Sequence, residues 1–287
     1  MTMVRGTLPN DSIETTMDPT PSGRATPRQV AVALGRAAAL NPWLGGRTDA
    51  PPPGTPDLAS LASDSDRLAG IVGRCAVRLG TQRQDVAAGL LFHDLAWRVL
   101  APALSAVVVA DVAPRLRPEA VTVVLDERGA STAAHFTAGA GLAGAATVGH
   151  RRTLLSPIRD DAVATLAPLV TAVRPLARRG EASLWGEVAD TIASALQMVG
   201  DLVGRVEECR AAADDLLDGR RPIRGGANWV EVDHAGMCCT WRVRNSCCKA
   251  FELGGHDYCA GCPMLGSDGQ RARFEALNEA RAAAASA

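Results

Sequence analysis

The cysteines of this chain gather near its C-terminus, in a pattern suited to binding a metal. The sequence has eight cysteines, and six of them lie between residues 238 and 262. These six form two adjacent pairs and one Cys-x-x-Cys turn: Cys238-Cys239, Cys247-Cys248 and Cys259-Ala260-Gly261-Cys262. A Cys-x-x-Cys turn lets two sulfurs converge on one metal, and thiolates bind both zinc and iron–sulfur clusters. We therefore expect a metal site built from thiolates.

The spacing of the cysteines leaves three kinds of site open. A [2Fe–2S] cluster needs four thiolates, and its two neighbouring irons suit adjacent cysteines, because one sulfur can serve each iron. Adjacent side chains on a β-strand point to opposite faces, so an adjacent pair can share a site only from an irregular backbone. Zinc is the main alternative, since sites with four cysteines are common and tetrahedral. A thiol redox pair at the Cys-x-x-Cys turn is the third.

Four of the cysteines repeat a known family signature. The string of Cys247-Cys248, ten residues, Cys259, two residues and Cys262 resembles the CC-x10-C-x2-C motif of the FhuF-type ferric siderophore reductases. The resemblance implies that these four cysteines hold a [2Fe–2S] cluster. The pair Cys238-Cys239 is not part of the family pattern; three roles are open for it, namely replacing ligands, forming a disulfide with the cluster cysteines on oxidation, or none.

Residues beside and upstream of the motif are similar to the same family. Arg244 stands three residues before the cysteine pair, and Phe251 stands three residues after it, as an arginine and an aromatic residue do in the family. The run from Ala87 to Pro102 resembles its Ala-rich helix with an aromatic-Arg-Leu-x-x-Pro end. Leu184-Trp-Gly-Glu187 resembles its Leu-Trp-Gly-Asn sequence, with glutamate in place of asparagine. The resemblance covers residues 57 to 266.

The resemblance implies an oxidoreductase that reduces ferric siderophores by one electron and so releases Fe(II). Siderophores hold hard Fe(III) through oxygen donors, and the softer Fe(II) binds the same donors less well. The expected partners are a ferric siderophore and an electron donor such as a ferredoxin, a flavoprotein or a siderophore-interacting reductase. No catalytic residue is needed beyond the cluster.

Three basic residues flank the first ligand pair, namely Arg242, Arg244 and Lys249. We interpret them as contacts for an anionic siderophore complex or as charges that stabilise the reduced cluster; solvated surface charge is the alternative. His234 and His256 lie close in sequence, but four suitably spaced cysteines make histidine ligands of the Rieske type unnecessary.

Two other functions remain open for the same residues. A ferredoxin-like electron carrier or accessory redox protein would use the same cluster with a protein partner. A zinc-stabilised binding module would use the same thiolates without redox chemistry. The colour of the purified protein separates the zinc module from both redox functions.

Composition and charge narrow the class of protein. The 30 basic and 31 acidic side chains give a net charge of -1, so no overall field attracts nucleic acid. The N-terminus lacks the apolar stretch of a secretory signal. The longest largely apolar run, Val99 to Ala110, is too short to span a bilayer, so we expect no integral membrane protein. A cytoplasmic location follows as the default, and thiols stay reduced there.

The elements that must position the cysteines are mainly helical. Aromatic residues make up 3% of the chain and the apolar fraction is 47%, mostly Ala, Val and Leu, which favours closely packed helices. The fold class we expect is α+β: mainly helical, with a small β-hairpin or sheet and a C-terminal cysteine-rich iron–sulfur segment. Ala120 to Leu125 and Thr132 to Phe136 flank a turn and predict the hairpin. Pro102 should kink or split the long apolar helix that contains it.

The chain divides into four expected parts. They are a disordered tail at residues 1–28, a mainly helical domain at 29–226 with a β-hairpin near 120–137, the iron–sulfur segment at 227–266, and an Ala-rich helical or disordered tail at 267–287.

Overall fold

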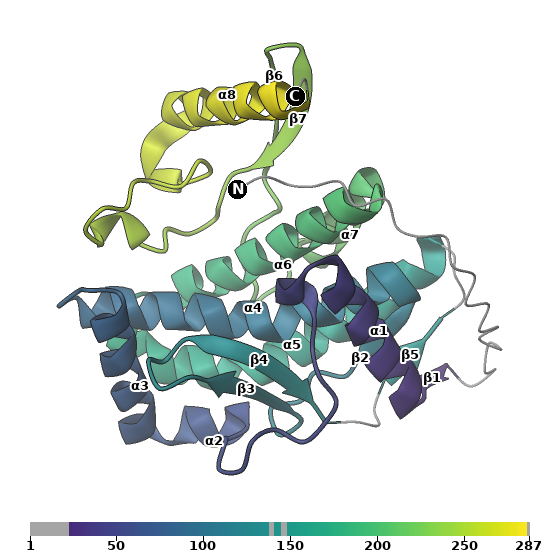
Figure 1. Cartoon of the computed structure of the whole chain (residues 1–287), viewed down its shortest axis with the longest axis vertical. Helices are drawn as coiled ribbons and strands as arrows, with labels where there is room; N and C mark the ends of the chain where they lie inside the picture. The colour runs from purple at the N-terminus through teal and green to yellow at the C-terminus, as the bar shows by residue number, and fades with distance from the viewer. Residues whose placement is uncertain (1–22, 138–140, 145–147, 286–287) are drawn as a thin grey trace.

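Helix α4 (Gln84–Ala110) lies at the centre of a computed structural model that describes residues 23–137, 141–144 and 148–285 (Figure 1). A helix that is apolar on all sides must be buried, and α4 is buried along most of its length. It stays one helix across Pro102, so the proline does not split it. Apolar packing on both sides of Pro102 outweighs the cost of about 3 kcal/mol for a proline inside a helix.

The other helices of this domain surround α4. Helices α1, α3, α5 and α6 contact it directly, whereas α2 packs on α5 and α7 packs on α6. The helical stretch that follows residue 180 is divided in two at Gly204, whose φ of 69° ends α6. The bounds are α1 (Pro27–Leu40), the short 3₁₀ helix η1 (Pro42–Leu44), α2 (Leu58–Ser63), α3 (Ser65–Arg78), α5 (Val148–Ala177), α6 (Glu181–Val203) and α7 (Val206–Leu216).

Two small antiparallel sheets complete the helical domain. Strands β3 (Val121–Leu125) and β4 (Ser131–Phe136) form the predicted hairpin, which is thereby confirmed. The second sheet has the order β1-β5-β2, built from β1 (Arg24–Ala25), β2 (Val112–Pro114) and β5 (Gly141–Ala143). Of the predicted N-terminal tail, residues 1–22 lie outside the described part, whereas its last residues form β1 and begin α1.

The last fifth of the chain forms a separate layer, which we call the C-terminal unit. Strands β6 (Trp229–His234) and β7 (Met237–Arg242) pair as an antiparallel hairpin, and α8 (Gly266–Ala285) packs on both. Between β7 and α8 runs the segment of residues 243–265, which we call the cysteine loop; it contains the 3₁₀ helices η2 (Ala250–Glu252) and η3 (Pro263–Leu265). The described part of the Ala-rich C-terminal segment is therefore helical.

Side chains on one face of β7 fasten α8 to the hairpin. The ring of Trp241 stacks on Phe274 of α8, with 5.6 Å between the ring centroids. Asn278 is fully buried, accepts a hydrogen bond from the Trp241 indole at 2.9 Å, and donates to the carbonyls of Val232 and Met237 at 2.8 and 3.1 Å. A buried amide with all these partners fixes the position of α8 on the hairpin.

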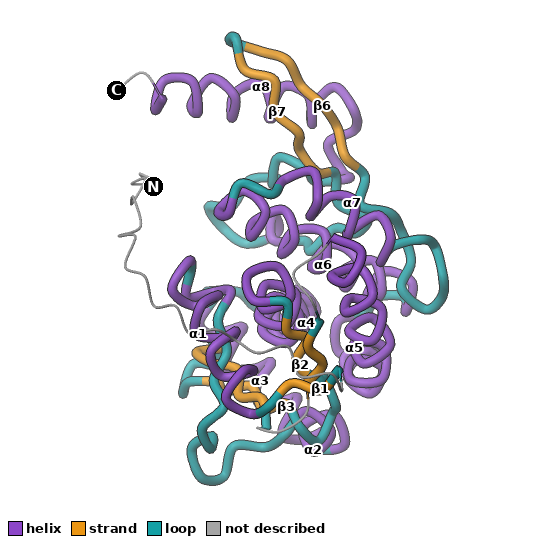
Figure 2. The backbone as a smooth tube through the Cα atoms, turned by 90° about the vertical axis from the view of Figure 1, so that its right-hand side faces the viewer, coloured by secondary structure: helices purple, strands orange, loops and turns teal. Residues whose placement is uncertain are grey.

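The C-terminal unit stands at one end of the helical domain, with α8 and the hairpin beyond α6 and α7 (Figures 1 and 2). The cysteine loop extends toward the end of the domain where α4 and α6 begin (Figure 1). Contacts fix it there: Arg83, just before α4, pairs with Glu252 at 2.5 Å, and Lys249 lies 3.7 Å from Asp85. The molecule is thus a mainly helical α+β fold with small antiparallel sheets, as the sequence predicted.

Among the described residues, α4 alone is long and apolar enough to cross a membrane by length and composition. However, 78% of its most apolar stretch is buried inside the fold. A mostly buried apolar helix is typical of a domain core, which is compatible with the prediction that the chain is not an integral membrane protein.

Candidate metal centre

Two acidic residues of α6 form the contacts that hold the cysteine loop against this helix. Glu187 and Asp190 are three positions apart and therefore share one face of the helix, and their side chains are 0% and 1% exposed. The loop can approach this face because residue 186 is glycine. A Cβ at Gly186 would lie only 3.3 Å from the Cβ of Ser246, which is closer than most such contacts.

Asp190 is the main anchor of the residues that precede the cysteine pair. It accepts hydrogen bonds from the guanidinium groups of Arg242 at 2.9 Å and Arg244 at 3.3 Å. It also accepts from the backbone N–H groups of Asn245 at 2.7 Å and Ser246 at 3.2 Å. A buried carboxylate is stable only with such partners, so the position of the loop and the charge of Asp190 depend on each other.

Glu187 joins the same loop to α4. Its carboxylate pairs with Arg244, with His93 at 2.7 Å, with Arg179 at 3.4 Å and with the hydroxyl of Ser246 at 3.1 Å. Burial alone would raise the pKa of Glu187, but the hydrogen bond to His93 and the positive charges around it lower that pKa to about 2. The residue is therefore a carboxylate at neutral pH.

The sulfurs of Cys247 and Cys262 are 3.9 Å apart. Two thiolates that lie about 2.3 Å from one tetrahedral metal are separated by about 3.8 Å, so this spacing fits a shared metal. The two residues come from opposite ends of the loop. Burial raises the pKa of the Cys262 thiol to about 11, and the neighbouring thiols of Cys247 and Cys259 act in the same direction.

Backbone amides point at both of these sulfurs from two residues further along the chain. The N–H of Lys249 donates to the Cys247 sulfur at 3.3 Å, and the N–H of Met264 bonds to the Cys262 sulfur. Lys249 adopts a φ of 61°, a left-handed conformation that is uncommon for a residue with a side chain. Such N–H···S bonds tune the properties of a metal bound to the sulfur.

The Cys-x-x-Cys turn is packed against the start of the loop, where only glycine fits. A Cβ at Gly261 would lie 2.2 Å from the carbonyl oxygen of Arg242, an impossible distance between atoms that are not bonded. The N–H of Arg244 donates to the carbonyl of Gly261 at 2.9 Å. The turn is therefore locked to the backbone that carries the two arginines.

Cys259 and Cys248 complete the group of four. Cys259 is an exposed residue, yet desolvation around its thiol raises the thiol pKa, and the Cys248 and Cys247 thiols raise it further. The charge of Arg244 and a hydrogen bond with Arg244 lower that pKa. The structure thus brings together the four cysteines that the sequence selected, with Arg244 against one of them.

The four thiols are neighbours without forming a closed cage. Within the part of the chain that the structure describes, no three side chains of His, Cys, Asp or Glu converge in a geometry ready for a metal ion. The Cys247–Cys262 spacing fits a metal as it stands. A cluster on all four cysteines would require Cys248 and Cys259 to approach that pair.

The other cysteines lie elsewhere. Cys238 and Cys239 are on β7, paired with Asp233 and Val232, with Cys238 exposed and Cys239 buried. At about 3.3 Å per residue, Cys239 is roughly 10 Å along the strand from Arg242, in the direction away from the loop. Cys75 and Cys209 are buried in α3 and α7, as expected for cysteines that pack as small apolar residues.

The three basic residues predicted to contact a substrate have different surroundings. Arg242 and Arg244 are 10% and 13% exposed, and their guanidinium groups are engaged with Asp190, Glu187 and Ser194. They are committed to the interior rather than to a bound complex. Lys249 is 33% exposed beside the cysteines, so it is the one of the three that faces solvent to a useful extent.

The sequence reasoning missed the acidic partners of these arginines. In the sequence, Glu187 stands out only because it replaces the asparagine of a motif, and Asp190 does not stand out as a site residue. The sequence does carry a usable signal, because two acids three positions apart in a largely apolar stretch of helix indicate buried charges that need cationic partners. Arg242 and Arg244, with one residue between them, were suitable partners.

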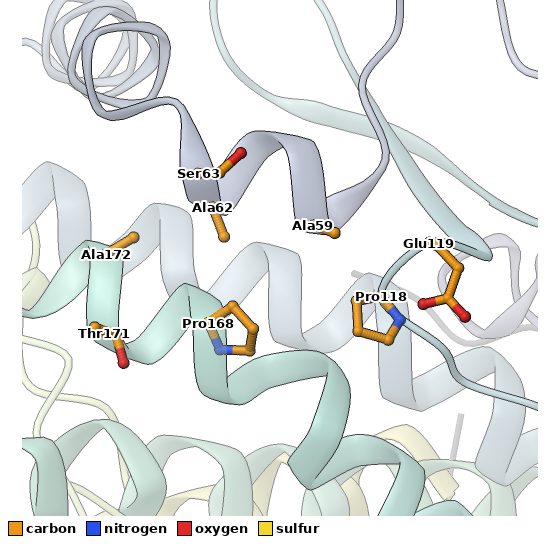
Figure 3. A pocket seen from close by; sticks show the side chains of 8 residues that line it. All are labelled: Ala59, Ala62, Ser63, Pro118, Glu119, Pro168, Thr171 and Ala172. Carbon is orange, nitrogen blue, oxygen red and sulfur yellow. The ribbon is translucent and has the colours of Figure 1, made fainter.

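A shallow pocket of about 480 Å³ lies far from these cysteines, between α2 and α5 (Figure 3). Ala59 and Ala62 of α2 face Pro168 of α5 across it (Figure 3). Its lining is largely apolar and contains neither cysteine nor histidine: Ala59, Ala62, Ser63, Pro118, Glu119, Pro168, Thr171 and Ala172. The pocket offers no group for the chemistry of the cysteine loop.

Comparisons with known proteins do not identify the chain. No protein-family model matches it. No curated protein matches it in sequence either. The similarity to the FhuF-type reductases therefore stays a prediction that rests on the cysteine motif and its flanking residues.

Proposed function

We propose that this protein carries a [2Fe–2S] cluster on Cys247, Cys248, Cys259 and Cys262 and uses it to reduce ferric siderophores. The observation that supports the proposal best is the 3.9 Å spacing of the Cys247 and Cys262 sulfurs, which suits two ligands of one tetrahedral iron. The proximity of Cys248 and Cys259 supplies the other two thiolates such a cluster needs.

When bound, the cluster would supply one electron at a time. One electron is what the substrate requires, because Fe(II) is held less tightly than Fe(III) by the oxygen donors of a siderophore. The electron would come from a donor such as a ferredoxin, a flavoprotein or a siderophore-interacting reductase, in the cytoplasm. The proposed function involves no nucleic-acid partner.

The chain's own residues would hold and expose the cluster. The Asp190 and Glu187 anchors fix the residues before Cys247, and the Gly261 turn fixes those before Cys262. Cys259 is exposed, which gives a bound substrate a short path for the electron. Lys249 is our candidate contact for an anionic complex, whereas Arg242 and Arg244 act from the interior.

The visible absorption spectrum of the purified full-length protein tests the cofactor. We expect a red-brown protein that is bleached by dithionite and contains two irons per chain on elemental analysis. A colourless protein that contains zinc would exclude both the reductase and the ferredoxin-like carrier, and would leave the zinc-stabilised module.

Mixing the dithionite-reduced protein with ferric siderophores under anaerobic conditions tests the reaction. We expect the cluster to reoxidise as Fe(II) appears, monitored with a ferrous chelator. A matched control is the Cys238→Ser protein, which keeps the four proposed ligands and should react at the same rate. If no siderophore class reoxidises the cluster while a protein acceptor does, the electron-carrier function replaces the reductase.

A further inference from the structure

A chain of polar contacts leads from the surface of α4 to the sulfur of Cys259. His93 has a side chain that is 37% exposed, and it lies 2.7 Å from the buried carboxylate of Glu187. The same carboxylate pairs with Arg244, whose backbone N–H donates to the carbonyl of Gly261 inside the Cys-x-x-Cys turn at 2.9 Å, and the Arg244 side chain lowers the pKa of the Cys259 thiol. In space, Arg244 therefore lies between Glu187 and the candidate metal centre and connects the two.

The geometry of Arg244 is set by two carboxylates on successive turns of α6. Its Nε lies 3.3 Å from Asp190, and its Nη2 pairs with Glu187. A planar guanidinium that is held at two points cannot rotate, so the direction of its remaining N–H groups is fixed.

Arg242 provides an internal comparison. It is buried to a similar degree and also pairs with Asp190, at 2.9 Å. Its second contact is the hydroxyl of Ser194 at 2.6 Å, one turn further along α6 and away from the loop. The two arginines therefore carry the same charge and share Asp190, but Arg244 is the one that pairs with Glu187 and acts on the Cys259 thiol.

We propose that Glu187 is a positioning residue that holds the Arg244 guanidinium against the Cys259 sulfur and thereby raises the reduction potential of the bound cluster. This rests on the proposed function, because it needs a redox-active cluster on these cysteines. One-electron reduction adds one negative charge to the cluster, and the electron comes from an external reductant such as dithionite. A fixed positive charge and an N–H···S bond stabilise the reduced state more than the oxidised state.

The experiment is a spectroscopic redox titration of the cluster in the full-length protein and in three variants. Arg244→Gln should lower the equilibrium constant for reduction about tenfold, which is 59 mV for a one-electron couple. Arg242→Gln, the matched control, should lower it by a clearly smaller factor. Equal effects of the two substitutions would overturn the proposal, because charge alone would then account for both.

Glu187→Gln is the decisive variant, because the two explanations predict opposite signs. Removing a nearby negative charge by itself raises the reduction potential. Losing the orientation of Arg244 lowers it. We expect a lower potential, and an increase or no change would show that Glu187 does not act by positioning Arg244.

A measurement that does not depend on the cluster separates this proposal from the proposed function. In the metal-free protein, we expect the Arg244 Nη–H groups, one of which pairs with Glu187, to give a protected signal in ¹⁵N-arginine NMR that Glu187→Gln abolishes and Gly254→Ala retains. Absence of that signal in the unmodified protein overturns the positioning role. A protein that binds only zinc overturns the proposed function and the effect on potential, while this signal still decides the positioning role. If Arg244→Gln does not fold, Arg244→Lys retains the charge without the fork and should lower the potential.

Discussion

The chain contains the same dipeptide, Cys-Cys, in two regions with different backbones. On β7, Cys238 and Cys239 follow the regular alternation of a strand, so one is exposed and the other buried. In the cysteine loop, Cys247 and Cys248 are both partly exposed and are followed by Lys249 in the left-handed conformation. The irregular backbone brings both loop residues near the sulfurs of the Cys-x-x-Cys turn.

The comparison shows that the spacing of cysteines is less informative than the backbone that carries them. A strand directs adjacent side chains to opposite faces, so a pair on a strand cannot chelate one metal. The loop can do so because buried charges of α6 hold its first residues, and Gly261 holds its last turn. The predictions that follow test this difference between the two pairs.

The largest effect should come from removing single sulfurs. Cys259→Ser and Cys262→Ser should each lose most of the bound iron, since a cluster with three thiolates and a hydroxyl is poorly held. Cys238→Ser and Cys75→Ser should keep it, and iron per chain is the measurement. Full iron content in Cys262→Ser would indicate that the β7 pair supplies a ligand, and it would contradict the difference between the two cysteine pairs.

A single methyl group at the turn should have the next largest effect. In Gly261→Ala the new Cβ meets the Arg242 carbonyl, so the turn must move away from the loop. We expect the free energy of unfolding to fall by about 1–3 kcal/mol, with reduced iron content. Gly254→Ala in the same loop is the control, because a Cβ there has no atom within 4 Å. Equal behaviour of the two variants would contradict the close packing of the turn.

Asp190, the buried anchor of the loop, can be weakened by a substitution that leaves every cysteine unchanged. Asp190→Asn leaves two buried arginines short of compensating charge, and we expect a loss of about 3 kcal/mol in stability together with reduced iron content. Asp161→Asn is a matched change in the helical domain, where Asp161 pairs with Arg115 at 2.6 Å. It should lower stability in chemical denaturation but leave the iron content of the folded protein unchanged.

The smallest effect should appear at the end of the hairpin that carries Cys238. A hydrogen bond with Glu279 raises the pKa of His234 above its ordinary value of 6.5. A raised pKa means that the contact stabilises the fold below pH 6.5, and that this contribution is lost as the pH rises through the raised pKa. Thermal unfolding of the unmodified protein and of Glu279→Gln should differ at acidic pH and coincide at alkaline pH. The reverse pattern would contradict the contact.

Local patterns in the sequence predicted much of this molecule. The hairpin near residues 120–137 follows from β-branched residues on both sides of a turn, and the selection of four cysteines follows from their spacing. The pair on β7 was harder to judge, because the strand Met237–Arg242 contains few of the residues that favour strands.

The charged anchor could not be predicted in the same way. Asp190 and Arg242 are 52 residues apart in the chain, and nothing near either residue specifies the other. The sequence therefore suggests Arg242 and Arg244 as substrate contacts, as charges that stabilise the reduced cluster or as solvated surface groups, whereas tertiary packing gives them buried partners. Long-range pairs of this kind depend on how helices and loops dock, which composition and periodicity do not contain.

The fully buried side chain of Asn278 has a consequence for assembly of the site. Because α8 is pinned to the hairpin at this residue, both ends of the cysteine loop are fixed before any metal arrives. A loop with fixed ends has already lost much of its chain entropy, so less is lost when the thiolates close on a metal. If the proposed cluster binds there, the terminal helix, which lies largely beyond the segment that resembles a known family, would lower the entropy cost of loading it.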